Sequence, residues 1–210
     1  MWATLSKVSE STYRRGMLSD KKILITGVTG QIGFPIANFL AKNNEVWGVA
    51  RFTNDRKKQF LEESNIQTFP LDLNSQDYGK LPNDFDHVIH FAIFQGQEND
   101  YDLAISNNAE ATGLLMSHCR DAKSVLIAST NSVYKPCADP WQKYKETDPL
   151  GDSTVTHSPT YGVSKLSQEA VARTMCRVLD LPTTIARINV SYGDNGGLPK
   201  YHFDLIADDK

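Results

Sequence analysis

Short apolar runs alternate with segments of helical periodicity along most of this chain. Apolar runs typical of buried strands occupy residues 23–25, 45–50, 66–71, 87–92, 124–129 and 183–187. Apolar residues three or four positions apart predict helices over about 32–40, 100–119 and 160–179, and a short polar helix is expected over 55–64. The inward side chains of the helix over 100–119 are expected to be Leu103, Ala104, Ala111, Leu114, Leu115 and Met116. Because strands that alternate with helices form parallel sheets with right-handed crossovers, the pattern predicts an α/β fold, a Rossmann-type doubly wound parallel sheet.

The first predicted strand runs directly into a glycine-rich turn, TGVTGQIG at residues 26–33. Gly27 permits a tight turn, Gly30 lets the backbone approach a pyrophosphate, and Gly33 lets the next helix pack closely. The helix N-terminus also favours an anion. The placement between strand and helix favours a dinucleotide site over a glycine turn without a ligand. Further cofactor contacts in the same turn are expected from Thr29, Gln31 and Ile32.

A tyrosine and a lysine share one face of the last predicted helix. Tyr161 and Lys165 are four residues apart, so the phenol and the ammonium point the same way. A phenol with a pKa of about 10 is a poor base at neutral pH, but a neighbouring cation stabilises the phenolate. Such a pair is commonplace as a solvated contact. Here it begins the helix after the fifth strand, whose carboxyl end carries the hydroxyl cluster 129–132, so we expect an acid/base site there.

The composition of the chain argues against several classes of binding partner. With a net charge of −3 the chain has no excess of basic residues to bind phosphates, so no nucleic-acid partner is expected. No apolar run approaches the length of a bilayer span, so no membrane partner is expected. The three cysteines and five histidines have no metal-ligand spacing, which predicts no metal site and favours the reducing cytoplasm over a disulfide framework.

Several motifs in order resemble those of the extended short-chain dehydrogenases/reductases, the NAD-dependent epimerases and dehydratases that act largely on nucleotide sugars. The resemblance covers about residues 22–193. Besides the motifs above, it rests on Asp72, on His90-Phe-Ala92, on Asn108, on Thr130 four residues before Tyr134, and on RINVSYG at 187–193. Three positions depart from the family pattern, and one of them is Ser191, which stands where the family has valine. Asn189 comes one place early, and Lys135 stands where the family has glycine.

The resemblance implies a role for each matching residue. Tyr161 would be the acid/base, Lys165 would bind the nicotinamide ribose and lower the Tyr161 pKa, and Thr130 would hydrogen-bond the reacting oxygen. Asp72 would contact the adenine, although a loop cap is the alternative. The remaining cofactor contacts that the resemblance implies are Leu73, Phe91, Ala92 and Asn108, of which Asn108 could instead serve a helix hydrogen bond. His90 is better interpreted as a core histidine, and Tyr134 as loop packing or a substrate-site wall.

The end of the second strand bears on the choice of cofactor. An NAD-selective site usually places an acid there, which accepts from the ribose 2′-hydroxyl. This strand instead ends in Arg51, with further cations at 56–58. A guanidinium matches a 2′-phosphate, so NADP is favoured over NAD, and the alternative is a surface arginine without a ligand.

The chain is expected to divide into three parts. Residues 1–20 are predicted to be a flexible N-terminal extension, 21–193 an NAD(P)-binding Rossmann domain, and 194–210 the start of a truncated substrate-binding region, with the C-terminal substrate domain largely absent. These residues are therefore expected to bind the cofactor but to turn over poorly alone. The loop 134–159 is too long for a plain connector and is expected to be a lid or binding loop. The alternative to truncation is a short form that recognises its substrate by this loop or by a partner chain.

Two classes of function remain open at this point. The first is an NAD(P)-dependent oxidoreductase, epimerase or dehydratase of a nucleotide sugar or a related carbonyl or hydroxyl compound. The second is a non-catalytic dinucleotide-binding regulatory or scaffold protein on the same fold. The set Thr130, Tyr161 and Lys165 favours the enzyme, because a sensor needs no acid/base. The resemblance also suggests a homodimer formed through the two long helices.

Overall fold

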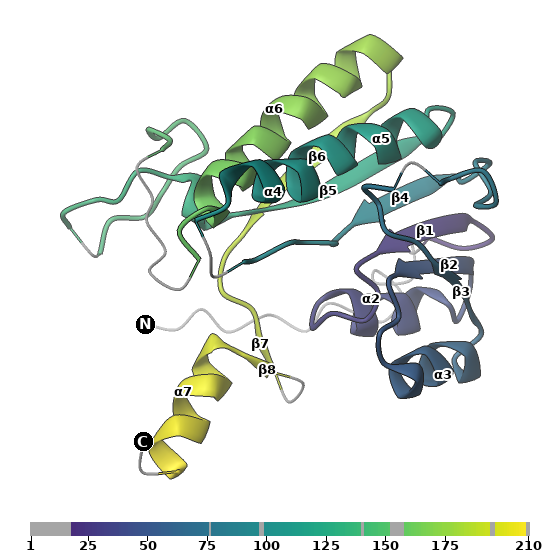
Figure 1. Ribbon diagram of the computed structural model, residues 1–210, viewed down its shortest axis with the longest axis horizontal. Coiled ribbons are helices and arrows are strands. Elements are labelled where there is room, and N and C mark those ends of the chain that lie inside the picture. Colours follow the sequence, from purple (N-terminus) through teal and green to yellow (C-terminus); the bar gives the residue numbers. More distant parts are fainter. Residues whose placement is uncertain are drawn as a thin grey trace, which may run out of the picture.

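A six-stranded parallel sheet forms the centre of the computed structural model, which describes residues 18–75, 77–96, 99–139, 141–151, 158–193 and 196–208 (Figure 1). Its strands are β1 (Lys22–Thr26), β2 (Glu45–Ala50), β3 (Ile66–Pro70), β4 (His87–His90), β5 (Ser124–Thr130) and β6 (Thr183–Ile188). The spatial order is β3-β2-β1-β4-β5-β6, with every neighbouring pair parallel. This order reverses between β1 and β4, as in a doubly wound sheet, and confirms the predicted fold class.

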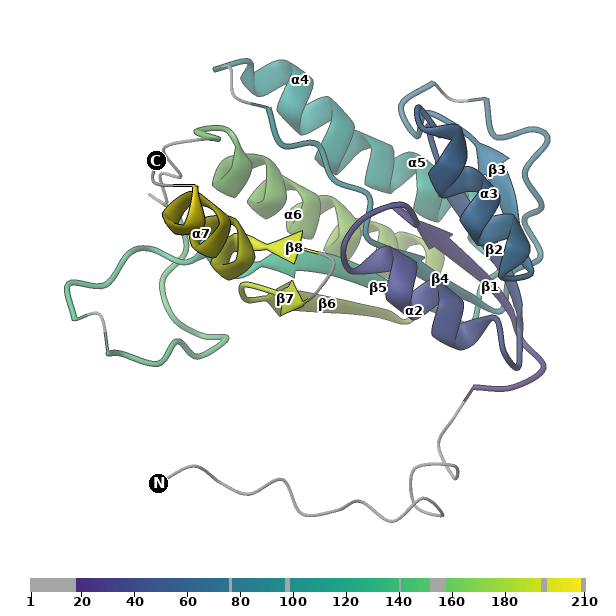
Figure 2. The same ribbon diagram turned by 90° about the horizontal axis from the view of Figure 1, so that it is seen from below.

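Helices cover both faces of the sheet (Figures 1 and 2). One face carries α2 (Gly33–Leu40) and α3 (Asp55–Glu63). The other carries α4 (Tyr101–Ile105), α5 (Ala111–His118) and α6 (Tyr161–Leu179). After β6 come two short antiparallel strands, β7 (Tyr192–Gly193) and β8 (Gly196–Gly197), and the helix α7 (Leu198–Ala207). Most of the expected N-terminal extension, residues 1–17, lies outside the described residues.

Alternate residues of the strands supply two separate cores. In β1, Ile23 and Ile25 pack with Leu61 under α2 and α3, whereas Leu24 joins Leu115 under α5 and α6. All five side chains are fully buried. Because neighbouring residues of a strand point to opposite faces, a continuous apolar run is what a strand covered on both faces requires.

The helix expected over 100–119 is not one continuous α-helix. Between α4 and α5 the backbone forms a five-residue π-helical segment, Ser106–Glu110. A π turn takes up extra chain, so the segments before and after it do not share one α-helical register, and a single periodic face cannot describe both. Leu103, expected to point inward, is 43% exposed, and that expectation was wrong. The buried side chains are Ala104, Ala111, Leu115 and Met116, with Leu114 partly buried.

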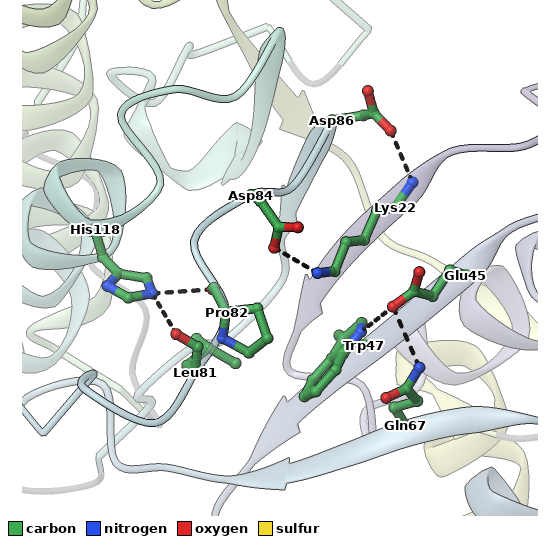
Figure 3. Close-up of polar contacts among 9 residues, drawn as sticks. All are labelled: Lys22, Glu45, Trp47, Gln67, Leu81, Pro82, Asp84, Asp86 and His118. Atoms are coloured by element: carbon green, nitrogen blue, oxygen red, sulfur yellow. Dashed lines mark hydrogen bonds and ion pairs between the residues drawn. The ribbon is translucent and has the colours of Figure 1, made fainter.

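Polar contacts fasten the loop before β4 at the amino ends of the strands (Figure 3). The Lys22 ammonium pairs with Asp84, and the Lys22 backbone N–H donates to the Asp86 carboxylate over 2.9 Å. His118 donates from Nε2 to two carbonyl oxygens of the same loop, each at 3.1 Å. These contacts join the loop before β4 to β1 and α5 at the amino ends of the strands. In such folds ligands bind at the opposite edge, the carboxyl ends of the strands.

Candidate dinucleotide and acid/base site

Two adjoining hollows lie at the carboxyl ends of the strands. One, of about 470 Å³, is bounded by the ends of β1, β2 and β4, and the other, of about 520 Å³, by the ends of β1, β5 and β6. Both are lined by Gly27, Gly30, Phe91 and Ile93, so they meet over the glycine turn. The sheet order reverses at this place, which is where an extended ligand binds in a doubly wound fold.

The three glycines of the turn serve different purposes. Gly27 has φ +67°, and a Cβ there would lie 2.6 Å from the backbone nitrogen of Ala92. A Cβ on Gly33 would lie 2.4 Å from the Gly27 carbonyl oxygen, so the fold itself requires both glycines. A Cβ on Gly30 meets only that same oxygen, at 3.1 Å, and Gly30 lines both hollows. Gly30 is thus the glycine that leaves room for a ligand.

The N-terminus of α2 has features that favour an anion. No side chain caps it, and its first turn holds no acidic residue. Gln31, beside this end, donates from Nε2 to the Ser191 carbonyl oxygen over 3.3 Å and so joins the turn to the segment after β6. An uncapped helix N-terminus over a glycine turn fits the pyrophosphate of a dinucleotide.

The first hollow contains the predicted ribose and adenine residues. Arg51, Asp72 and Leu73 line it, together with Thr29 of the turn. The Asp72 carboxylate also accepts from the Asn74 backbone N–H over 3.1 Å, so it caps its own loop as well as facing the hollow. Sequence reasoning did not single out the other polar residues in the lining, which are Thr53, Asn54 and Asn107.

Lys57 is a further cation in this first hollow. Its ammonium donates to the Thr29 carbonyl oxygen over 3.2 Å, which links α3 to the glycine turn. Asn54 caps α3 by accepting from the Lys57 backbone N–H. The cap fixes the start of α3 and so places Lys57 in the same hollow as Arg51.

Thr130, Tyr161 and Lys165 come together in the second hollow, with Gln31, Ile32 and Gly33 on its far side. Lys165 is 2% exposed, and its ammonium donates to the Ala128 carbonyl oxygen over 2.6 Å and to the Gln168 side-chain oxygen. Burial lowers the pKa of Lys165 to about 8, against an opposing effect of Glu169. Burial raises the pKa of Tyr161, and a hydrogen bond with the Thr130 hydroxyl acts the other way.

A partly buried ion pair adjoins this hollow through Ser129. Arg187 on β6 binds the Glu169 carboxylate with two nitrogens, Nε at 2.9 Å and Nη2 at 2.8 Å. The Ser129 hydroxyl donates to the same carboxylate over 2.5 Å. Arg187 also lies over the Tyr134 ring, 4.8 Å from its centroid, so Tyr134 packs the loop. Sequence reasoning missed Glu169, although it lies four residues after Lys165 on the same face of α6.

Asn108, expected among the cofactor contacts, is fully buried and lines neither hollow. Its side chain accepts from the Phe94 backbone N–H over 2.7 Å and donates to the Phe94 carbonyl oxygen over 2.8 Å. It also donates to the Ser164 hydroxyl over 2.9 Å. Asn108 therefore fixes the wall after β4, while Phe91 and Ala92 line the hollow themselves.

His90 lies in the core, between Thr26 and Thr112. Burial lowers its pKa from 6.5 to about 3, so the folded protein holds it neutral while the unfolded chain protonates below pH 6.5. The stability that this provides is complete above pH 6.5 and is lost progressively towards pH 3. In His90→Gln we expect the free energy of unfolding to fall less steeply between pH 6.5 and 5, by about 1.4 kcal/mol per unit.

The measurement for His90 is urea unfolding at each pH. Replacement of the exposed His202 by glutamine is the matched control, and it should keep the wild-type slope. Equal slopes in wild type and His90→Gln would contradict the neutral, buried state of His90.

Within the described ranges, no helix is long and apolar enough to cross a membrane. Across the same described residues, no three His, Cys, Asp or Glu side chains gather where they could hold a metal ion.

Residues 23–206 match the model of the NAD dependent epimerase/dehydratase family, and the chain belongs to that family. No curated protein sequence matches it. Among solved structures, UDP-glucuronic acid 4-epimerase from Bacillus cereus in complex with NAD is 29% identical, with a TM-score of 0.73, and the match covers 90% of this chain and 63% of that one.

Two more distant structures share the fold. UDP-N-acetylglucosamine 4-epimerase from Methanobrevibacter ruminantium M1 is 21% identical with a TM-score of 0.73, and the match covers 92% of this chain and 64% of that one. The dTDP-glucose 4,6-dehydratase DesIV from Streptomyces venezuelae is 22% identical with a TM-score of 0.72, and the match covers 89% and 62% respectively. The chain thus spans somewhat less than two thirds of the length of these structures.

Proposed function

We propose that this protein is an NAD(P)-dependent epimerase, dehydratase or reductase of a nucleotide sugar. The observation that carries the proposal is that Thr130, Tyr161 and Lys165 line the same hollow as the glycine turn. The family match supports the class of reaction, and the UDP-sugar and dTDP-sugar enzymes of similar structure support the class of substrate.

The proposed chemistry divides between cofactor and chain. When bound, the nicotinamide supplies a hydride acceptor or donor at C4. Tyr161 takes or returns the proton of the substrate hydroxyl at its phenolic oxygen, and Thr130 orients that oxygen by a hydrogen bond. Lys165 holds the nicotinamide ribose with its ammonium, and its charge favours the phenolate of Tyr161.

The test is product analysis with a panel of UDP- and dTDP-sugars, each with NAD⁺ or NADP⁺. We expect one sugar to be epimerised, dehydrated or reduced by the wild type, at a low rate by this chain alone, and Lys165→Met to weaken both turnover and cofactor affinity. The non-catalytic alternative predicts cofactor binding with no turnover of any sugar.

Cofactor preference is proposed to favour NADP. Arg51 and Lys57 both line the first hollow, whereas no acid stands at the end of β2. We expect Arg51→Ala to weaken NADPH binding about tenfold and to leave NADH binding nearly unchanged, because a charge-assisted pair to the 2′-phosphate is lost. Calorimetric titration with both dinucleotides measures this.

The matched control for Arg51 is Lys58→Ala. Lys58 pairs with Glu62 along α3 and does not line the hollow, so the variant should keep both affinities. A wild type that prefers NADH, with no effect of Arg51→Ala, would contradict the NADP assignment.

Two further features belong to the proposal. We place the protein in the cytoplasm, because its cysteines 119, 137 and 176 are unpaired thiols and a reducing compartment keeps them so. We also propose a homodimer, by analogy with the family, with the α5 and α6 face as the contact.

A further inference from the structure

A glutamine lies against the site lysine in the core. Gln168 is fully buried one turn after Lys165 on α6, and its side-chain oxygen accepts from the Lys165 ammonium. Its Nε2 donates to the Thr112 hydroxyl on α5 over 2.8 Å. The amide therefore joins the lysine of the site to the neighbouring helix.

The protons along this contact can be assigned in full. The Thr112 hydroxyl donates its one proton to the Asn108 carbonyl oxygen over 2.6 Å. Its oxygen must therefore accept from Gln168 and also from His90 Nε2, which lies at 2.9 Å. His90 Nδ1 is then unprotonated and accepts from the Thr26 hydroxyl over 2.6 Å. Only one orientation of the Gln168 amide satisfies this chain, the one with its oxygen towards Lys165.

The same assignment accounts for the N–H donors of the Lys165 ammonium. An ammonium has three N–H donors. One is used by the Ala128 carbonyl oxygen on β5 and one by the Gln168 oxygen, which leaves one for the hollow that Lys165 lines. The direction of that last N–H depends on both acceptors, and Gln168 is the one that a substitution can remove.

We propose that Gln168 is a positioning residue for Lys165, held in orientation by Thr112 and His90. The proposal rests on the proposed function, in which Lys165 binds the nicotinamide ribose. Gln168 also stabilises the charged lysine, because its carbonyl oxygen accepts an ammonium proton where burial disfavours the charge.

Other ionisable groups lie around Lys165, and each has a defined charge state or a defined effect on the Lys165 pKa. On its own helix, Glu169 raises the pKa of Lys165, and Glu169 is itself held by Arg187 from β6. His90 on β4 is neutral near pH 7 because burial lowers its pKa to about 3. Tyr161, one turn earlier on α6, is protonated since burial raises its pKa. All of these groups are retained when Gln168 is replaced, so we attribute a shift in the Lys165 pKa to Gln168.

The experiment measures the Lys165 pKa directly, by NMR titration of protein labelled with ¹³C at the lysine ε-carbons and without cofactor. Lys165→Met assigns the signal. The wild type should titrate near 8. Gln168→Met removes the accepting oxygen and should lower the pKa by about one unit, whereas Gln168→Glu adds a negative charge and should raise it by about one unit. Ser167→Ala, at the preceding position on α6, should leave it unchanged.

The downward shift in Gln168→Met tests whether the Gln168 oxygen supports the ammonium, because a merely structural role would leave the Lys165 pKa unchanged. The upward shift in Gln168→Glu shows that position 168 faces the ammonium. Thermal unfolding shows that each variant is folded. Gln168→Asn, whose shorter amide cannot reach the ammonium, replaces either variant that fails to fold and should lower the pKa. An unchanged Lys165 pKa in the folded variants would overturn the proposal.

A second measurement, NADPH affinity, keeps the two proposals apart. If Lys165→Met binds NADPH like the wild type, the proposed role of Lys165 fails, whatever the titration shows. If Lys165→Met binds weakly while the Lys165 pKa is the same in every Gln168 variant, only the positioning role of Gln168 fails.

Discussion

Phenylalanine in place of Tyr161 is expected to lower turnover by about 10²–10⁴-fold and to change NADPH affinity less than about twofold. The ring is partly buried at the start of α6 and packs in the same way without its hydroxyl. What is lost is the only proton donor or acceptor that Tyr161 offers in the hollow. Steady-state kinetics on the sugar that the wild type converts, together with calorimetry for the cofactor, measure the two effects separately.

Tyr101→Phe is the matched control for this variant. Tyr101 is 45% exposed on α4 and lines neither hollow, so removal of its hydroxyl should leave turnover unchanged. If Tyr161→Phe retained most of the wild-type rate, Tyr161 would not be the acid/base, and the proposed enzyme would lose its central residue.

The second large effect is on stability. Arg187→Met is expected to lower the free energy of unfolding by about 3 kcal/mol at neutral pH, because it leaves the buried Glu169 carboxylate with a single hydroxyl partner. Arg187 lowers the Glu169 pKa, so the wild-type pair stabilises above the unfolded pKa of a glutamate and less as pH falls. The deficit of Arg187→Met should therefore shrink towards pH 4.

Two comparisons make the Arg187 result specific. The double variant Glu169→Gln with Arg187→Met should recover most of the loss, because no buried charge remains. Lys200→Ala breaks an exposed pair with Asp204 on α7 and should cost less than about 1 kcal/mol. Urea unfolding gives all four free energies, and a loss in Arg187→Met no larger than in Lys200→Ala would contradict the buried ion pair.

Local patterns were enough to predict the sheet. A strand buried on both faces must be apolar throughout, and all six apolar runs correspond to strands whose bounds differ from the prediction by at most two residues. The glycine turn was also predictable, because its requirements lie within eight consecutive residues. Both are local constraints, which can be recognised from consecutive residues of the sequence.

Features that depend on contacts between distant segments were not predictable in the same way. The π-helical segment 106–110 interrupts a helix whose sequence has ordinary periodicity, and so Leu103 was placed on the wrong face. Glu169 and Gln168 look like ordinary surface positions of α6 until Arg187 and Thr112 are placed against them. Asn108 supports the wall of the hollow without lining it, and this role likewise depends on a contact with Phe94, fourteen residues away in sequence.

The most direct test of the central claim is a titration of the wild type and of Gly30→Ala with NADPH and NADH. A Cβ at Gly30 enters the space over the turn and meets only one backbone oxygen, at 3.1 Å, so the variant should fold like the wild type. We predict saturable binding of a dinucleotide by the wild type, and a large loss of affinity in Gly30→Ala with a nearly unchanged melting temperature. Absence of binding in the wild type, or equal binding in folded Gly30→Ala, would contradict a dinucleotide site at this turn.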